Sequence, residues 1–118
     1  VHQDSHGGLA VIGVMIEEGA ANAALADAWA HLPAHETAAQ TVADVSVNAS
    51  AVLPADGRYY HYKGSLTTPP CSENVNWHVV EKVLEASPAQ IAVMEQALGM
   101  SARSIQPANN RLIVAPAD

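Results

Sequence analysis

The sequence predicts a mainly β chain in which a sheet is accompanied by two short peripheral helices. Residues 9–16 form an unbroken apolar run (LAVIGVMI), and its β-branched composition is typical of a central strand buried on both faces. Residues 58–63 are rich in tyrosine, which also favours a strand. An alanine-rich stretch at 23–32 and the pair Ser87-Pro88 favour a helix each.

Composition limits both the core and the partners. The chain has 118 residues, of which 49% are hydrophobic, but many of these are alanine and none is phenylalanine. Because alanine buries little area, the core should be thin, which suits part of a domain better than a whole one. The net charge of −7 with five Lys and Arg argues against nucleic-acid binding. No apolar run approaches the ~18 residues of a membrane-spanning helix.

The first elements follow from turns and apolar runs. Val1–Asp4 is expected to end a strand, Ser5–Gly8 to make a tight turn, and Leu9–Ile16 to complete a hairpin. Residues 17–22 should form a loop. The chain begins at Val1 without methionine, so the lack of a visible signal peptide establishes little.

The middle of the chain is predicted less sharply. A helix is expected over Ala23–Leu32, ended by Pro33. His31 and His35 have the i, i+4 spacing of a helical metal site, but Pro33 lies between them and breaks that geometry, which favours two solvated histidines. One short strand is expected within Thr37–Ala51, from the spacing of Val42, Val45 and Val47.

The second half is better marked. Leu53–Gly57 predicts a turn, Arg58–Lys63 a strand that stops at Gly64, and Asn76–Glu81 a second strand. Ser87-Pro88 should cap a helix that ends at Gly99, with one apolar face made by Ile91, Met94 and Leu98. Residues 103–114 should be irregular and then extended.

Between the two strands of the second half lies the loop Thr67-Thr68-Pro69-Pro70. Each proline fixes its φ near −65° and lacks an N–H, so this backbone cannot be a central strand or a helix interior. It should be a rigid loop that fixes two threonine hydroxyls, with the bond between Pro69 and Pro70 a candidate for the cis isomer. These four residues alone are also typical of an ordinary turn at the end of a strand.

The longer string YKGSLTTPPCSENVNW, from Tyr62 to Trp77, closely resembles the signature of the α-class carbonic anhydrases, particularly the bacterial ones. Residues 105–111 (IQPANNR) resemble a late motif of that family, with Ala108 in place of leucine. The resemblance runs from Val1 to about Val114, and it is poor over 36–51. It implies that residues 1–118 are the C-terminal half of one such domain, with a partial large mixed sheet and the N-terminal half absent.

The resemblance implies reversible hydration of carbon dioxide to bicarbonate and a proton. In the family, zinc held by three histidines lowers the pKa of bound water to about 7. The third of these histidines would stand two residues before the position of Val1, so all three ligands are expected in the missing half and none in this chain. His2 should lie on the opposite face of its strand and is not expected to bind zinc.

The resemblance also assigns roles to residues of this chain. Thr67 is the expected catalytic residue: its hydroxyl would orient the attacking hydroxide, and its N–H a substrate or inhibitor oxygen. Thr68 should line the polar side of the cavity. The apolar wall for carbon dioxide is expected from Val1, Val11, Leu66 and Trp77, although core packing alone would also suit these four. Glu73 and Arg111 match structural positions, where burial would demand partners; His61 should be a surface or sheet residue.

The partners and the compartment come from the resemblance as well. Cys71 is the one cysteine and cannot form an internal disulfide. A single cysteine in an acidic chain is usually a buried or inert thiol, whereas by resemblance it pairs with an upstream cysteine, which implies a periplasmic or secreted protein. Sulfonamides or anions are expected inhibitors, and a homodimer is compatible with the family.

The alternative interpretation is a zinc-free carbonic-anhydrase-like binding or structural module. Upstream sequence would discriminate the two, and retention of Thr67 and Thr68 favours the enzyme. These 118 residues alone are expected to be inactive.

Overall fold

The computed structural model describes residues 1–33 and 35–117. The chain separates into two compact units, and each is described by itself. The first unit comprises Val1–Met15, Pro54–Val83 and Ala102–Asp118, and the second comprises Ile16–Leu53 and Leu84–Ser101. Among the helices of the described residues, none is both long and apolar enough to cross a membrane.

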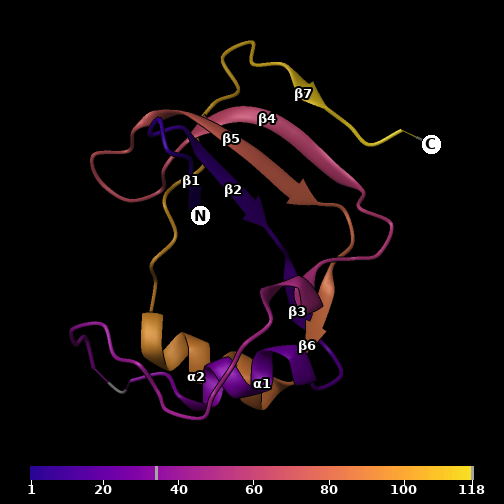
Figure 1. The fold of residues 1–118 in the computed structure, drawn as a ribbon. Coiled ribbons are helices and arrows are strands. Elements are labelled where there is room, and N and C mark those ends of the chain that lie inside the picture. The colour runs from indigo at the N-terminus through magenta and orange to yellow at the C-terminus, as the bar shows by residue number, and fades with distance from the viewer. Residues whose placement is uncertain (34, 118) are drawn as a thin grey trace. The chain divides into compact units, whose positions relative to one another are not determined.

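The first unit is built on a mixed sheet (Figure 1). Its strands in the described residues, in spatial order, are β1 (His2–Gln3), β2 (Leu9–Gly13), β5 (Glu73–Val80), β4 (Tyr59–Ser65) and β7 (Ile113–Val114). β2 and β5 run parallel, whereas β1–β2, β5–β4 and β4–β7 are antiparallel. The predicted mainly β fold with a mixed sheet and two short helices is therefore confirmed.

The predicted N-terminal hairpin is present. Asp4 closes its turn, because one carboxylate oxygen accepts from the backbone N–H of His6 at 2.8 Å and of Gly8 at 2.7 Å. Gly7 adopts a φ of 84°, which glycine does without a steric penalty.

The predicted strand Leu9–Ile16 differs from the structure in length and in burial. β2 stops at Gly13, and Ile16 begins the separate strand β3 (Ile16–Glu18). Only one face of β2 is well covered: Val11 is 7% exposed, whereas its neighbour Ile12 is 42% exposed. Burial on both faces was wrong because hydropathy reports what a side chain prefers, while burial needs partner atoms on each face, and the described residues supply few on the face of Ile12.

The strand that leads to the proline loop is longer than predicted. β4 continues through Gly64 to Ser65, with a register irregularity between these two residues. Gly64 does not end the strand. It makes room, since a Cβ there would lie 2.8 Å from Cδ1 of Trp77.

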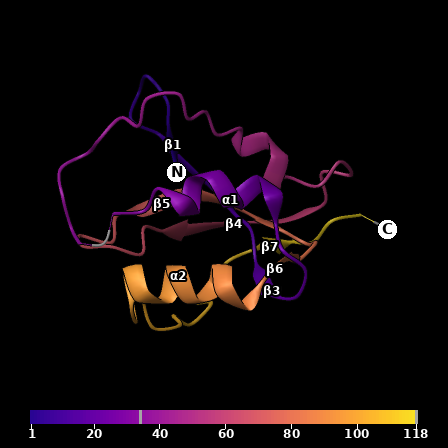
Figure 2. The ribbon, with the colours of Figure 1, turned by 90° about the horizontal axis from the view of Figure 1, so that it is seen from below.

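The second unit pairs β3 in parallel with β6 (Leu84–Ala86) and carries α1 (Ala23–Ala30), α2 (Pro88–Leu98) and a short 3₁₀ turn, η1 (Ala49–Val52). The helices α1 and α2 contact each other (Figure 2). The start of α1 is fixed by Asn22, whose side chain accepts from the N–H of Ala24 at 3.0 Å. α1 ends at Ala30, two residues before the predicted end.

Two predictions in this unit were wrong. Residues 17–22 were predicted as a loop, but Glu17 and Glu18 belong to β3. The predicted strand within 37–51 is absent from the described residues, where η1 is the regular element nearby. Val42 and Val47 are exposed because valine spacing alone provides no neighbouring strand for the backbone to pair with.

The capped helix was predicted correctly. Ser87 and Gln90 form a reciprocal capping box at the start of α2, and Gly99, with a φ of 57°, ends it. The predicted apolar face is only partly covered, since Ile91 and Met94 are half-buried but Leu98 is 58% exposed. Leu98 lies in the last turn, where few neighbouring atoms of its unit reach it.

The core is thin, as the composition predicted. Among the described residues, the buried hydrophobic side chains are Val11, Val75, Val80 and Ala86. The first three lie on β2 and β5, so the best-packed part of the first unit is the parallel strand pair that adjoins the proline loop.

Candidate functional site

The loop between β4 and β5 is held by its own backbone. The N–H of Leu66 donates to the carbonyl of Ser72 at 2.9 Å, and that of Cys71 to the carbonyl of Thr68 at 2.8 Å. The peptide bond between Pro69 and Pro70 is cis, as predicted. One backbone hydrogen bond joins the two ends of the loop, a second lies within it, and two prolines restrict its φ angles. The loop therefore has little conformational freedom.

Thr67 and Thr68 lie on this loop and are exposed. Across residues 1–33 and 35–117, neither hydroxyl has a hydrogen-bond partner, and the N–H of Thr67 donates to no carbonyl. The loop therefore offers polar groups whose hydrogen bonds are not satisfied within the described chain. Such groups on a rigid support can bind an incoming molecule in exchange for water, without breaking a hydrogen bond within the protein.

Trp77 provides the apolar surface next to the loop. It lies opposite Val11 in the parallel register and opposite Tyr62 in the antiparallel one. Residues paired in register point to the same face of a sheet, and the rings of Tyr62 and Trp77 stack with centroids 6.2 Å apart. The indole Nε1 donates to the carbonyl of Ser65 at 2.9 Å, which fixes Trp77 beside the end of β4, where the loop begins.

The remaining predicted wall residues differ in how firmly they are held. Leu66 is half-buried at the start of the loop. Val1 precedes β1, and continuing the register that pairs His2 with Ala10 would align Val1 with Val11. Its side chain is nevertheless 78% exposed. The structure thus pairs Val11 with Trp77 and bonds Trp77 to Ser65 at the start of the loop that holds Leu66, Thr67 and Thr68, while Val1 packs against little in the described chain.

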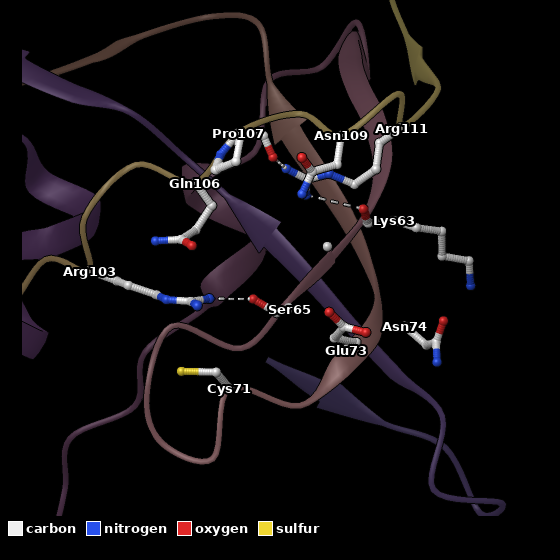
Figure 3. A pocket seen from close by; sticks show the side chains of 11 residues that line it. Lys63, Ser65, Cys71, Glu73, Asn74, Arg103, Gln106, Pro107, Asn109 and Arg111 are labelled. Carbon is white, nitrogen blue, oxygen red and sulfur yellow. Dashed lines mark hydrogen bonds between the residues drawn. The ribbon is translucent and has the colours of Figure 1, made fainter.

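Ser65 also lines a polar cavity of about 380 Å³. Figure 3 shows its lining, which comes from β4, the start of β5 and residues 103–111. Arg103 donates through Nη1 to Oγ of Ser65 at 2.7 Å. Sequence reasoning missed Ser65 and Arg103; Ser65 lay inside the quoted signature, but nothing in the pattern indicated that a residue 38 positions away binds it.

Glu73 and Arg111 also line this cavity, and because both are exposed, neither charge requires a buried partner. The guanidinium of Arg111 donates to the carbonyls of Pro107 and Ala108, each at 2.9 Å, and lies 5.8 Å from the ring centroid of Tyr62. Arg111 therefore fixes the turn at 107–111 against β4 from the surface, where its charge needs no buried partner.

The cavity is locally basic in an acidic chain. Lys63, Arg103 and Arg111 line it together with a single carboxylate, Glu73, although the whole chain has five Lys and Arg. The thiol of Cys71 also lines it and is free and half-buried. Its pairing with an upstream cysteine stays a prediction.

Metal ligands do not gather near Thr67. Within the described residues, no group of three or more His, Cys, Asp or Glu side chains could hold a metal ion. His2 is exposed on β1, and His61 and His78 pair across β4 and β5. The residues present do not by themselves fit a zinc site that needs three protein ligands.

Comparison with known proteins shows the family to which this chain belongs. The sequence model described as eukaryotic-type carbonic anhydrase matches residues 1–116. The chain belongs to the α-class carbonic anhydrase family. It is similar to a carbonic anhydrase of Nostoc sp., with 45% identity over 114 residues, covering 97% of this chain and 43% of that protein. The chain thus spans about half the length of the curated relatives it matches.

Solved carbonic anhydrases share the fold. A hyperthermostable carbonic anhydrase identified from an active hydrothermal vent chimney superposes with a TM-score of 0.85 at 42% identity, covering 98% of this chain and 52% of that one. The α-carbonic anhydrase of Thermovibrio ammonificans, solved in complex with the inhibitor sulfanilamide, gives 0.86 at 34% identity, covering 95% and 50%. Almost all of this chain therefore superposes on about half of each solved chain.

Proposed function

We propose that the protein containing this chain catalyses the reversible hydration of carbon dioxide to bicarbonate and a proton. The observation that carries the proposal is the fixed loop that holds Thr67. Its backbone groups bond to one another, and Trp77, which shares a register position with Val11, donates to the carbonyl of Ser65, two residues before Thr67. Family membership supports the same reaction. Carbon dioxide is apolar and uncharged, so it needs an apolar surface for binding and a separate polar group to direct the attacking oxygen.

Thr67 can supply two interactions. Its Oγ1 can accept a hydrogen bond from the attacking hydroxide while donating its own proton to a carboxylate, which fixes the direction of the hydroxide lone pair. Its backbone N–H can donate to the oxygen on which negative charge develops in the product. Both groups have no partner within the described chain, so a substrate would not have to displace a protein contact.

Zinc would supply a hydroxide nucleophile at neutral pH when bound. The described residues offer no ligand set for it. We propose that the ligands, like the carboxylate that accepts the proton of Thr67, belong to the part of the domain that this chain does not span. The present chain would then contribute Thr67, Thr68 and the wall residues Val1, Val11, Leu66 and Trp77.

Three further proposals rest on resemblance. Sulfonamides or anions should inhibit the whole protein, which is supported by the sulfanilamide complex of the similar Thermovibrio protein. Cys71 should pair with an upstream cysteine in a periplasmic or secreted protein. A homodimer is compatible with this family. The alternative function, a zinc-free binding module, would require an upstream sequence without the three histidines.

The test is to measure stopped-flow hydration of carbon dioxide by the protein extended upstream to the length of its relatives. Thr67→Ala should lower kcat/KM about 100-fold, or ~2.7 kcal/mol, with zinc content unchanged. Thr67→Ser, which keeps the hydroxyl, should retain most activity, and Thr68→Ala should lose less than Thr67→Ala. Parental activity in Thr67→Ala would contradict the role of Thr67, and an inactive, zinc-free extended protein would favour the binding module.

A further inference from the structure

His61 and His78 lie directly opposite each other on β4 and β5. Their ring centroids are 4.7 Å apart with the planes tilted by 33°. Two imidazoles that share one metal ion at ~2.0–2.1 Å from each nitrogen place their ring centroids roughly 5 Å apart. The observed centroid spacing therefore satisfies the distance condition for two imidazoles on one ion.

The hydrogen bonding of His61 selects one nitrogen as a ligand. Its Nδ1 lies 3.1 Å from the carbonyl oxygen of Trp77, and because a carbonyl can only accept, Nδ1 must carry the proton. The lone pair of the neutral ring is then on Nε2. A ring N–H bonded to a backbone carbonyl is the usual arrangement behind a metal-binding histidine, because it fixes both tautomer and ring orientation.

The pair is accessible to solvent. Both histidines line a cavity of about 520 Å³ between Gly57–Tyr59 and residues 114–117, which leaves room for water as additional ligands. Tyr59 packs edge-on against His78 with centroids 4.9 Å apart and supports that ring from one side. Within the described chain, His78 has no hydrogen bond to either ring nitrogen, so each of them is free to bind.

The cavity lining includes one positively charged side chain, Arg58, and this side chain forms a salt bridge with Glu81. Arg58 donates through Nε to Glu81 at 2.6 Å. That hydrogen bond, followed by the charge of Glu81, raises the pKa of Arg58, so the two side chains keep opposite charges together. A divalent ion at the histidine pair therefore meets an ion pair rather than a lone cation.

We propose that His61 and His78 form a two-histidine site for a divalent transition-metal ion of the zinc or nickel class, with water completing the coordination. Imidazole nitrogen suits these metals, whereas magnesium and calcium prefer oxygen ligands. The proposal concerns residues of this chain alone and does not depend on carbonic anhydrase activity.

The experiment is calorimetric titration of the 118-residue chain with Zn²⁺ and with Ni²⁺, alone and without carbon dioxide. We expect one site that His61→Ala or His78→Ala weakens by ~10-fold or more. Because both residues act on one ion, the double variant should lose little beyond either single variant. His2→Ala and His35→Ala, which remove exposed histidines elsewhere, are the matched controls.

A second measurement links binding to the folded sheet. Paramagnetic Ni²⁺ should broaden the ring NMR signals of His61, His78 and Tyr59 before those of His2 and His35, and the preference should vanish in urea. Equal affinity of the parent and His78→Ala, equal losses in the control variants, or additive losses in the double variant would each overturn the proposal. So would binding that persists unchanged after unfolding.

Discussion

Replacing Gly64 by alanine tests how the loop between β4 and β5 is supported. A Cβ at this position would lie 2.8 Å from Cδ1 and 3.2 Å from Nε1 of Trp77, and 3.0 Å from Cε2 of Tyr62. Trp77 cannot move away freely, because its Nε1 donates to Ser65 at 2.9 Å and its ring stacks on Tyr62. Relieving the overlap should cost about 1–3 kcal/mol, the usual range for overpacking.

The assay is urea unfolding of the extended protein, followed by tryptophan fluorescence, with the free energy taken from the midpoint and slope. Gly13→Ala is the matched control. Gly13 lies on β2, and its added Cβ would be 3.5 Å from the same indole, an ordinary contact. With no positive φ at Gly13, the control should be neutral or stabilised by up to ~1 kcal/mol, the usual gain of Ala over Gly. Equal stability of Gly64→Ala and Gly13→Ala would refute the reasoning.

Two further predictions concern the chain and its helix. The 118-residue chain alone should show no hydration of carbon dioxide above the buffer rate by stopped-flow, since the described residues hold no three-ligand metal group; measurable, zinc-dependent turnover would show that a ligand set was overlooked. In the extended protein, Ser87→Ala should lower the free energy of unfolding by about 1 kcal/mol, because Oγ of Ser87 accepts from the N–H of Gln90. Ser87→Asn should keep most of that stability, and a loss as large as that of alanine would argue against the cap.

The elements predicted best are those fixed by local chemistry. Ser87, Pro88 and Gly99 bound a helix through caps that need no distant partner, and the two prolines define the loop on their own. The elements predicted worst depend on distant partners. β6 was missed altogether because three residues become a strand only through pairing with β3, and the valines at 42, 45 and 47 have no such partner strand within the described residues.

In the candidate site, too, the features that depend on neighbouring residues were predicted from the residues themselves, and those that depend on distant residues were not. The two prolines indicated a rigid loop with two hydroxyls, but the roles of Thr67, Val11 and Trp77 came from resemblance to a family. The structure adds why two of them are neighbours: Val11 and Trp77 share a register position on adjacent parallel strands. The contact of Arg103 with Ser65 joins residues 38 positions apart, and a single sequence contains no signal for such a pair.

The contacts that position Thr67 lie almost entirely within a short stretch of the chain. The bonds of Leu66 to Ser72, Cys71 to Thr68 and Trp77 to Ser65 all fall between residues 65 and 77, and the parallel pairing with β2 supports them from outside. The group that would accept the proton of Thr67, and the ligands of the metal, are not found among the described residues. The orienting group and the nucleophile of the proposed reaction would therefore come from different parts of the domain. Because the loop is fixed by its own bonds, it can hold Thr67 at a set position, and catalysis would then depend on how accurately the remaining part of the domain aligns with β2 and β5.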